Sequence, residues 1–437
     1  MIPRDQHHIS RKDISSSALK VLNGLHDAGH QAYLVGGGVR DLLLGLKPKD
    51  FDVATDATPE QVKKCFRNSR IIGKRFRLVH VFYGREIIEI ATFRATTTDS
   101  TPSDQTISRT CPDSGMITRD NRYGTIEEDA IRRDFTVNAL YYNIADFSVV
   151  DFLGGVDDLH SRQMNIIGDP ATRYREDPVR MLRAVRLSTK LGFTIADHSE
   201  KPIAEMAQLL QQVSHARLWD ESLKLFLSGH AQETWHKLKK TKLADSLFPQ
   251  TIKSLQSKNS TTFRAFIEKA LASTDERIHQ GKPVTPAFLF AVWLWQPMLD
   301  RQQNFIIKHC APAESFNKAC SKILAEHHQQ IAMPRRFSTV VREIWQLQNQ
   351  LWKRQGKRHE RVFAHPRFRA AYDFLLLRAI PGSEEEKLAQ WWTDYQQASI
   401  DQRATMVKAL NRQTNRKRRR KSGKVNTTSE KGPSRNE

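Results

Sequence analysis

The stretch YLVGGGVRDLLLGLKPKDFDV, residues 33–53, decides the fold of the N-terminal region. A short apolar run leads into three glycines, an amphipathic segment over 39–46 follows, and two aspartates then flank a phenylalanine. This order predicts a strand, a glycine turn, a helix and a second strand. The second strand would carry Asp50 and Asp52 at positions i and i+2, so their carboxylates would point to the same face.

The two aspartates suit a site for divalent cations. Positions i and i+2 of a strand lie roughly 6.5–7 Å apart, and two such carboxylates can share cations about 3.5–4 Å apart. Mg²⁺ prefers hard carboxylate oxygens and keeps some of its waters. We therefore predict that Asp50 and Asp52 bind Mg²⁺ and act as catalytic residues in phosphoryl or nucleotidyl transfer.

The glycines that precede the aspartates suit a phosphate group. The backbone N–H groups of Gly36, Gly37 and Gly38 can approach an anion closely where a helix begins. Arg40 would stand one turn into that helix, in a position to reach a triphosphate. Asp41 could instead pair with a neighbouring basic side chain and be structural. Each signal is weak alone, because most Asp-x-Asp pairs are solvated turns. Their order along the chain is what favours nucleotide chemistry.

The remaining pattern predicts an α+β protein. Short β-rich runs over 51–54, 79–83 and 87–93 indicate strands, and Thr58 to Gln61 carries the signature of a capped helix start. Helical spacing dominates after Thr172. We expect an N-terminal head with a small mixed β-sheet, followed by an all-α neck and body.

The charge of the chain indicates a polyanionic partner. The 437 residues carry a formal net charge of +21, and the sequence pI is about 9.9. Such an excess of cations raises the local concentration of anions and supports salt-sensitive binding along a phosphate backbone. Solubility alone would be served by a charge of either sign, so the sign favours nucleic acid.

The cysteines and the apolar segments point to the cytoplasm. Four cysteines without a C-x-x-C pair predict neither a disulfide framework nor a thiolate metal site. The N-terminal residues 1–22 lack the apolar core of a signal peptide. The densest apolar run, residues 288–295, is far too short to span a bilayer, so we expect no stable membrane insertion.

Five ordered segments resemble the class II nucleotidyltransferases, the superfamily that contains bacterial poly(A) polymerases and tRNA CCA-adding enzymes. They are LVGGGVRD with KDFDV (34–41 and 49–53), GKRFRLVHV (73–81), EIIEIATFR (86–94), EEDAIRRDFTVNAL (127–140) and YREDPVRMLRAVR (174–186). Together they extend over about half of the chain. The resemblance implies a nucleotidyltransferase that uses ATP as a nucleotide donor.

A third acid would help to hold the cation that activates the attacking hydroxyl. Glu89 lies in an apolar strand where an unpaired carboxylate is costly, although it could also be an edge-strand residue facing water. The resemblance aligns Asp134 with a functional carboxylate. We carry both, with Glu89 assigned to metal and Asp134 to catalysis or ribose contact. Arg132 and Arg133 are further candidates for contacts with the triphosphate.

The segment around Asp177 and Arg180 is the candidate for base selection. The two residues are spaced i, i+3, which places them on one helix face as an acceptor and a donor. The resemblance implies that they read the edge of an incoming base without a nucleic-acid template. In isolation the pair would be interpreted as a surface salt bridge. Arg183 continues the basic stripe that could flank a nucleotide or primer.

Within the superfamily, the resemblance is greater to the poly(A) polymerases, which add AMP from ATP to RNA 3′ ends, release pyrophosphate and promote RNA turnover. Three segments favour this branch, namely 73–81, 354–358 and 365–379, and a long basic tail suits a generic RNA substrate. The alternatives are a CCA-adding enzyme and a catalytically inactive RNA-binding protein. The partners implied are RNA 3′ ends and ATP, with no protein partner indicated.

We divide the chain into four parts on these grounds. Residues 1–150 form the predicted catalytic head, 151–215 the nucleotide-recognition neck, and 216–400 a helical RNA-binding body. Residues 401–437 contain the run RKRRRK and are predicted to be a basic disordered tail. Residues 95–121, which are rich in Thr, Ser, Asp and Pro, predict a mobile loop.

Overall fold

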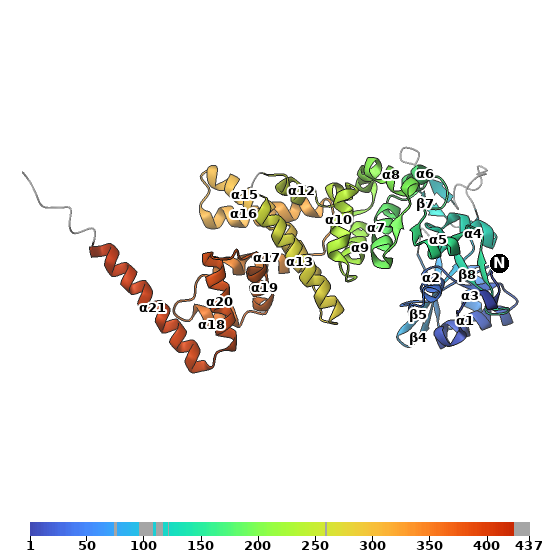
Figure 1. Ribbon diagram of the computed structural model, residues 1–437, viewed down its shortest axis with the longest axis horizontal. Coiled ribbons are helices and arrows are strands. Elements are labelled where there is room, and N and C mark those ends of the chain that lie inside the picture. The colour runs from blue at the N-terminus through green and yellow to red at the C-terminus, as the bar shows by residue number, and fades with distance from the viewer. Residues whose placement is uncertain (74–76, 96–107, 111–116, 121, 258–259, 424–437) are drawn as a thin grey trace, which may run out of the picture. The chain divides into compact units, whose positions relative to one another are not determined.

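The computed structural model describes residues 1–73, 77–95, 108–110, 117–120, 122–257 and 260–423 (Figure 1). The chain forms two compact units. The first unit comprises Met1–Leu225 and Glu233–Leu247, and the second comprises Phe226–Gln232 and Phe248–Glu437. The four-part division by function stays a prediction within this frame.

A mixed β-sheet of seven strands forms the centre of the first unit, in the order β3-β4-β5-β2-β1-β8-β9. β2 and β5 run parallel, and the other neighbours in this sheet are antiparallel. The strands are β1 (Ala32–Val35), β2 (Asp52–Thr55), β3 (Ser69–Ile72), β4 (Leu78–Tyr83), β5 (Glu86–Thr92), β8 (Leu140–Tyr142) and β9 (Val149–Asp151). The predicted α+β head with a mixed sheet is therefore confirmed.

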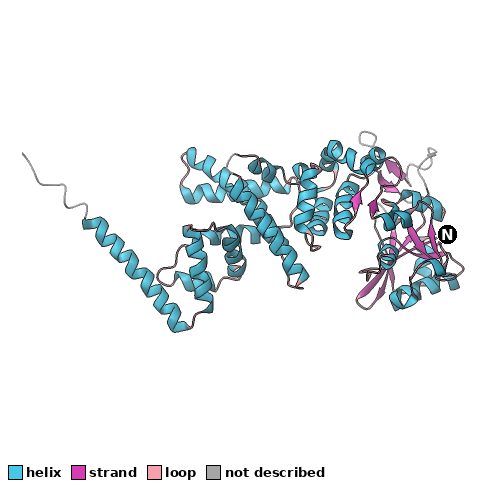
Figure 2. Ribbon diagram, viewed as in Figure 1, coloured by secondary structure: helices cyan, strands magenta, loops and turns pink. Residues whose placement is uncertain are grey.

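Short helices connect and cover these strands (Figure 2). They are α1 (Ser16–Asp27), α2 (Gly37–Leu43), α3 (Pro59–Cys65), α4 (Ile126–Arg132) and α5 (Gly155–Ser161). The start of α3 carries the predicted capping box, in which Thr58 and Gln61 each accept a hydrogen bond from the other's backbone N–H. Local sequence therefore fixes where this helix begins.

Apolar side chains from the middle strands and α4 pack into a core beneath the glycine turn. Val35, Ala54, Phe93, Ala130 and Tyr141 belong to one buried cluster. Burial of such groups contributes roughly 1.5–3 kcal/mol for each large side chain. The cluster holds the ends of β1 and β2 in a fixed register, and the candidate site lies at these ends.

The neck part of the first unit is helical. Its elements are α6 (Pro170–Glu176), α7 (Val179–Leu191), α8 (Asp197–Met206), α9 (His215–Phe226), α10 (Ala231–Lys240) and α11 (Leu243–Leu247), with a small parallel pair of β10 (Gln163–Met164) and β11 (Thr194–Ile195). The helical spacing predicted after Thr172 is confirmed here, for example in α7. Gly192 ends it in the left-handed conformation at φ 67°.

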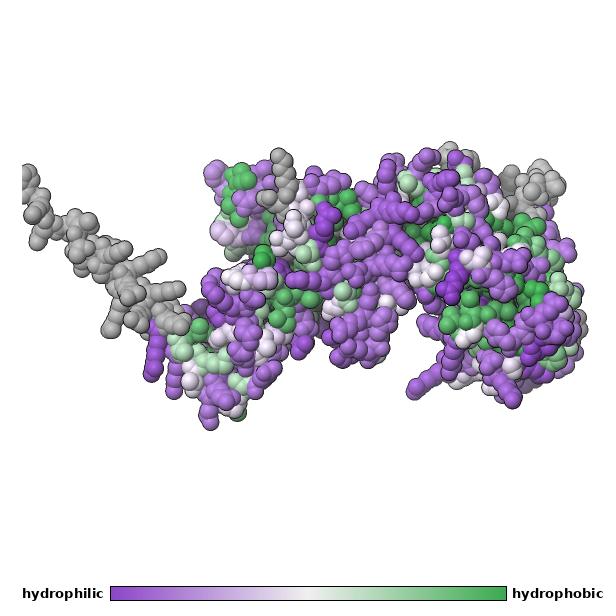
Figure 3. Space-filling model, in the orientation of Figure 1, coloured by the Kyte–Doolittle hydropathy of each residue, from purple (hydrophilic) through white to green (hydrophobic). Residues whose placement is uncertain are grey.

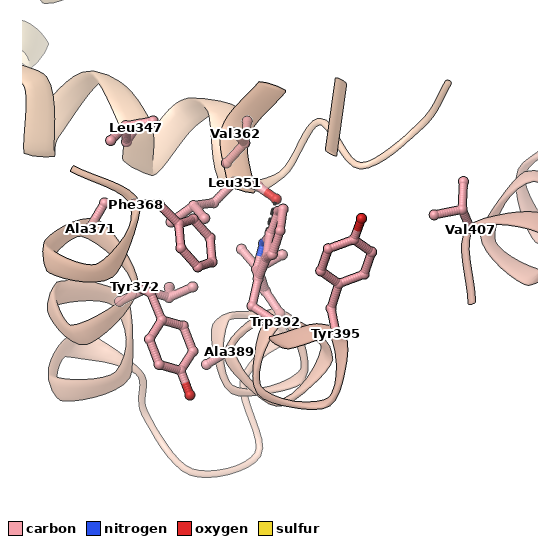
Figure 4. Close-up of a cluster of buried hydrophobic side chains, with 12 residues drawn as sticks. Leu347, Leu351, Val362, Phe368, Ala371, Tyr372, Ala389, Trp392, Tyr395 and Val407 are labelled. Atoms are coloured by element: carbon pink, nitrogen blue, oxygen red, sulfur yellow. Dashed lines mark hydrogen bonds between the residues drawn. The ribbon is translucent and has the colours of Figure 1, made fainter. Parts of the chain in front are cut away.

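The second unit contains only helices among its described elements (Figure 2). Their bounds are α12 (Pro249–Leu255), α13 (Thr261–His279), α14 (Pro286–Trp293), α15 (Trp295–Ile307), α16 (Pro312–His328), α17 (Arg335–Leu351), α18 (Arg358–Phe363), α19 (Phe368–Arg378), α20 (Glu384–Gln397) and α21 (Ile400–Gly423). Figure 4 shows one of its cores, where Trp392 packs against Phe368 and Tyr395. The Trp392 indole donates a hydrogen bond of 3.0 Å to the Leu351 carbonyl, which ties α20 to α17.

The C-terminal segment differs from its prediction. Residues up to Gly423 continue as α21, so the expected disorder from residue 401 is wrong as far as Gly423. Arg, Lys and Gln, which are frequent in this segment, are good helix formers. Residues 424–437 lie outside the described residues, as does most of the loop predicted over 95–121. Within that loop the structure describes a hairpin of β6 (Ser108–Thr110) and β7 (Ile117–Asp120).

The surface is mainly polar. Figure 3 shows hydrophilic residues over much of the visible face of each unit, with hydrophobic residues gathered in patches. Among the described residues, we find no helix that combines the length and the apolar character needed to cross a membrane.

Candidate active site

The two aspartates of the Asp-x-Asp motif lie at the beginning of β2. Asp52 is its first residue and pairs with Val35 of β1, whereas Asp50 precedes the strand. The prediction that both aspartates lie within the strand is therefore wrong for Asp50. β1 ends at Val35, and the glycine turn that follows offers β2 no further partner. Both aspartates are exposed, so their carboxylates can be reached from solvent.

Glu89 lies next to Asp52 on the neighbouring strand. The parallel pairing of β2 and β5 puts the two residues in register, so their side chains lie on the same face of the sheet. The protein atoms around the Asp52 carboxylate desolvate it in part although the residue is exposed, and this desolvation, followed by the charge of Glu89, raises the pKa of Asp52 to about 6. The His80 ring lies 3.1 Å from Glu89 Oε2. The structure thus brings together two of the predicted metal ligands.

The glycine turn packs against the Asp50 backbone. Gly36 has φ 71° and ψ −133°, a conformation that suits only glycine. A Cβ at Gly38 would lie 3.5 Å from the Asp50 carbonyl oxygen, and one at Gly36 would lie 3.6 Å from Arg133 Nη1. The turn therefore holds the N-terminus of α2, the Asp50 segment and a guanidinium side by side.

Arg133 is fixed by two partners. Its guanidinium donates to Asp129 Oδ2 at 2.9 and 3.1 Å and to the Tyr141 hydroxyl at 2.9 Å. Burial alone would lower the pKa of Arg133, but the Asp129 carboxylate raises it above its usual value. Arg132 instead donates to the Ala95 carbonyl. Of the two arginines, Arg133 is the one placed at the glycine turn, and the predicted triphosphate contact of Arg132 stays a prediction.

A buried chain of polar groups connects the start of α2 to α7. Arg40 donates to Asp41 Oδ1 at 2.9 and 2.6 Å and to Asn138 Oδ1 at 2.6 Å. Asn138 in turn donates to Asp134 Oδ1 at 3.1 Å, and Arg183 donates to Asp134 Oδ2 at 2.6 Å. Arg40 is only 4% exposed. This geometry favours a structural role for Arg40, and its contact with a triphosphate stays a prediction.

Asp134 is satisfied by this network. It also accepts a 2.9 Å hydrogen bond from the Phe135 backbone N–H. Burial would raise the pKa of Asp134, but Arg183 and Asn138 outweigh it and lower the pKa to about 2. The carboxylate is thus ionised and fully occupied by its neighbours. Of the two candidates for the third acid, Glu89 is the one beside Asp52.

The base-selection residues lie at a break between two helices. Asp177 follows α6 with φ −151° and ψ 94°, because Pro178 disfavours a helical conformation for the residue before it. The prediction of one helix face for Asp177 and Arg180 is therefore wrong. A backbone hydrogen bond of 3.0 Å from the Arg180 N–H to the Asp177 carbonyl joins the two residues. The Arg180 side chain donates to Glu176 Oε2 at 2.8 Å.

Arg217 of α9 binds the Asp177 carboxylate. Its Nη1 and Nη2 donate to Asp177 Oδ1 and Oδ2 at 2.8 and 2.7 Å, a bidentate pair. Sequence reasoning missed Arg217 and Asn138, because each meets its partner only after the chain folds. The sequence around a charged residue on an amphipathic helix does not indicate which distant residue it contacts. It also missed Asp129, although its i,i+4 spacing from Arg133 is a signal that the sequence does contain.

The donor set fits a cation that substrate phosphates help to hold. Among the described residues, no cluster of three or more His, Cys, Asp or Glu side chains is close enough to bind a metal by itself. Mg²⁺ commonly takes only one or two carboxylates from the protein and completes its shell with phosphates and water. Asp50, Asp52 and Glu89 supply the hard oxygens that such a site requires.

Comparison with known proteins shows which family the chain belongs to. Three family models match the chain: the poly A polymerase head domain over residues 32–165, a probable RNA and SrmB-binding site of polymerase A over 192–255, and the polymerase A arginine-rich C-terminus over 308–424. The chain is 48% identical over 423 residues to poly(A) polymerase I of Salmonella typhi, covering 96% of this chain and 90% of that protein. The chain belongs to the poly(A) polymerase I family. It is a polynucleotide adenylyltransferase, as the resemblance implied.

CCA-adding enzymes are similar over a smaller part of the chain. The enzyme of Lactobacillus helveticus is 37% identical over 235 residues, which cover 54% of this chain and 56% of that one. The solved structure of the Thermotoga maritima CCA-adding enzyme with tRNA covers 87% of this chain and 82% of its own, with a TM-score of 0.56 and 20% identity. The latter shows a shared fold.

Proposed function

We propose that this chain adds AMP units from ATP to RNA 3′ ends without a template, releases pyrophosphate, and so promotes RNA turnover in the cytoplasm. The observation that carries the proposal is the meeting of Asp52 and Glu89 in register beside the glycine turn that packs on Asp50. The similarity to poly(A) polymerase I extends over nearly the whole chain, including the helical second unit. The net charge of +21 suits a polyanionic acceptor of no single sequence.

In this reaction the glycine turn binds the triphosphate. The N–H groups of Gly37 and Gly38 at the start of α2 face the anion, aided by the partial positive charge of the helix N-terminus. Arg133, held beside Gly36 by Asp129, adds a fixed cation. Because its partners already fix its position, little reorganisation accompanies phosphate binding.

Asp177 and Arg180 would read the adenine. Asp177 Oδ1 accepts hydrogen bonds from Arg217 and from the Val179 N–H, and Oδ2 accepts one from Arg217. A carboxylate oriented in this way would accept the adenine amino group. Arg180 is held by Glu176 and by the Arg173 carbonyl, both at 2.8 Å, so its remaining donors have a defined direction. Arg183, fixed by Asp134, would flank the nucleotide or the primer.

Asp50, Asp52 and Glu89 are the residues that would hold Mg²⁺. When bound with the nucleotide, Mg²⁺ would neutralise the triphosphate and make the RNA 3′-hydroxyl more acidic. Asp134 keeps its neighbours in place, because its pKa of about 2 leaves it ionised at any physiological pH.

The test is an extension assay with each NTP in turn. A purified chain is incubated with Mg²⁺, an unrelated RNA and a tRNA that lacks its CCA terminus. Long tails from ATP alone on either RNA are the expected result. Incorporation of CTP that stops after a fixed addition to the tRNA would instead identify a CCA-adding enzyme.

Variants separate catalysis from RNA binding. The Asp50→Ala, Asp52→Ala variant should lose all Mg²⁺-dependent extension and still bind RNA. The matched control replaces Asp5 and Asp27, two exposed acids outside the site, by alanine and should extend RNA normally. Extension that persists in the Asp50→Ala, Asp52→Ala variant would refute the proposed site.

A further inference from the structure

The second unit contains a cavity that the proposed reaction does not use. Its volume is about 650 Å³, and its walls come from α13, α14, α17 and α19, which pack against one another. We call it the body cavity. Its lining includes Arg277, Phe288, Arg336, Phe337, Ala370 and Leu376. Pockets for small organic ligands commonly enclose about 300–1,000 Å³, so the size suits a group as large as one nucleotide.

One side of the body cavity is apolar and aromatic. Phe288 and Phe337 are only partly buried, and Leu376 is 41% exposed. Phe288 is supported from behind by Phe374, at 6.2 Å between ring centroids and an interplanar angle of 80°. Aromatic faces that remain accessible in a cavity can stack on flat ligands.

The rim of the body cavity carries a surplus of positive charge. Four arginines line it against one acid, Asp373. Arg369 pairs with Asp373 at 3.0 Å, and Arg367 pairs with Glu343 at 3.2 Å. Among the described residues we find no carboxylate paired with Arg277 or Arg336, and Arg277 Nη2 donates to the Pro283 carbonyl at 3.1 Å. Two guanidinium charges are therefore left for an anion.

Arg336 and Phe337 combine both features. The Arg336 guanidinium lies 4.9 Å from the centre of the Phe337 ring. A cation and an aromatic ring arranged in this way bind a base by stacking while the charge reaches the adjacent phosphate. An acidic peptide would match the charge but would leave the aromatic side without a flat partner.

We propose that the body cavity binds one nucleotide of the RNA acceptor upstream of its 3′ end. The base enters against Phe288 and Phe337, and the phosphates on either side bind Arg277 and Arg336. This inference rests on the proposed use of RNA as the acceptor. It adds a site that retains the RNA body while the 3′ end is extended elsewhere in the chain.

Three full-length variants test the two halves of the inference. Arg277→Ala, Arg336→Ala removes the two charges, and Ala370→Trp fills the cavity without changing charge. The matched control, Lys308→Ala, Lys322→Ala, removes two charges from exposed positions of the same unit that do not line the cavity. Affinity for a fluorescent oligo(A) is measured by anisotropy at several salt concentrations, together with an oligonucleotide of equal length without bases.

The two kinds of variant should differ in a defined way. Loss of two phosphate contacts should lower the slope of log affinity against log salt by about 1.4, since each contact to a single strand contributes roughly 0.7. Ala370→Trp should leave that slope unchanged and weaken oligo(A) about tenfold, through lost stacking. It should not weaken the oligonucleotide without bases. The lysine control should bind oligo(A) within about twofold of the parent chain.

Two results would overturn the inference. One is an Ala370→Trp variant that folds and distinguishes oligo(A) from the baseless strand as well as the parent chain does. The other is an arginine variant that binds no more weakly than the lysine control. Thermal melting checks each fold, and Phe337→Leu replaces Ala370→Trp in the same comparison if that variant does not fold. A parent chain that extends RNA while these variants bind it normally would sink this inference alone, whereas a parent chain that extends no RNA would sink the proposed function.

Discussion

Replacing Arg217 by alanine should weaken the choice of ATP over CTP. In the structure Arg217 binds both oxygens of Asp177, and the side chains are 34% and 18% exposed. Without Arg217, the Asp177 carboxylate can rotate and loses the orientation in which it meets the adenine amino group. Arg217 acts through Asp177, so it is a positioning residue.

The two hydrogen bonds between Arg217 and Asp177 set the size of the expected effect on kcat/KM. Hydrogen bonds to charged groups contribute about 1.5–3 kcal/mol, and partial exposure of this pair reduces the value toward about 1–2 kcal/mol. Since about 1.4 kcal/mol corresponds to a factor of ten, kcat/KM for ATP should fall about tenfold. CTP incorporation should change less, so the ATP/CTP ratio of kcat/KM should fall. Arg217→Lys keeps the charge but not the bidentate contact, and it should recover stability more than discrimination.

The assay is steady-state extension of one RNA primer with ATP and with CTP. Lys190→Ala, which removes an exposed cation at the end of α7, is the matched control and should leave both values unchanged. The reasoning is refuted if Arg217→Ala melts like the parent chain and keeps its ATP/CTP ratio within twofold.

Three further changes test His327 and the two candidates for the third acid. His327 is fully buried, and neither of its ring nitrogens has a hydrogen-bond partner among the described residues. Burial lowers the pKa of His327 to about 3. In the unfolded chain the imidazole of His327 takes up a proton near pH 6.5, so the free energy of unfolding should fall by about 2 kcal/mol from pH 7 to pH 5. Urea titrations at the two pH values measure this loss, and His327→Phe should remove it. A loss of the same size in His327→Phe would contradict the prediction. Asp134→Asn leaves Arg183 opposite a neutral amide and should destabilise the fold by about 3 kcal/mol without changing the Mg²⁺ concentration for half-maximal activity. Glu89→Gln should raise the Mg²⁺ concentration for half-maximal activity roughly tenfold or more. If Asp134→Asn raised it and Glu89→Gln did not, Asp134 and not Glu89 would be the metal ligand.

Local chemistry explains what could be predicted from the sequence. The capping box at Thr58, the strand over 32–35 and the helix that ends at Gly192 are each determined by residues within one or two turns of chain. The Asp-x-Asp motif and the glycine turn are also local, and they located the candidate site before any fold was known.

Contacts between distant segments explain what could not be predicted. Arg217 is 40 residues from Asp177, and Asn138 is 98 residues from Arg40. No spacing rule connects such pairs, since their meeting depends on how α9 and the segment after α4 pack. The strand assignment of Asp50 failed for a similar reason, because the length of β2 is set by where β1 ends.

The two candidates for the third acid were equivalent in sequence, and the folded environment separates them. Asp134 has gained a cation and two further donors, so its charge is neutralised within the protein and its pKa lies at about 2. Desolvation, and next the charge of Glu89, instead raise the pKa of Asp52 to about 6, so the negative charges at the start of β2 repel one another. A bound cation would relieve that repulsion and displace the proton that Asp52 tends to keep, so metal affinity at this site should increase as pH rises through 6. We therefore predict that Glu89, rather than Asp134, is the third metal ligand beside the Asp-x-Asp motif.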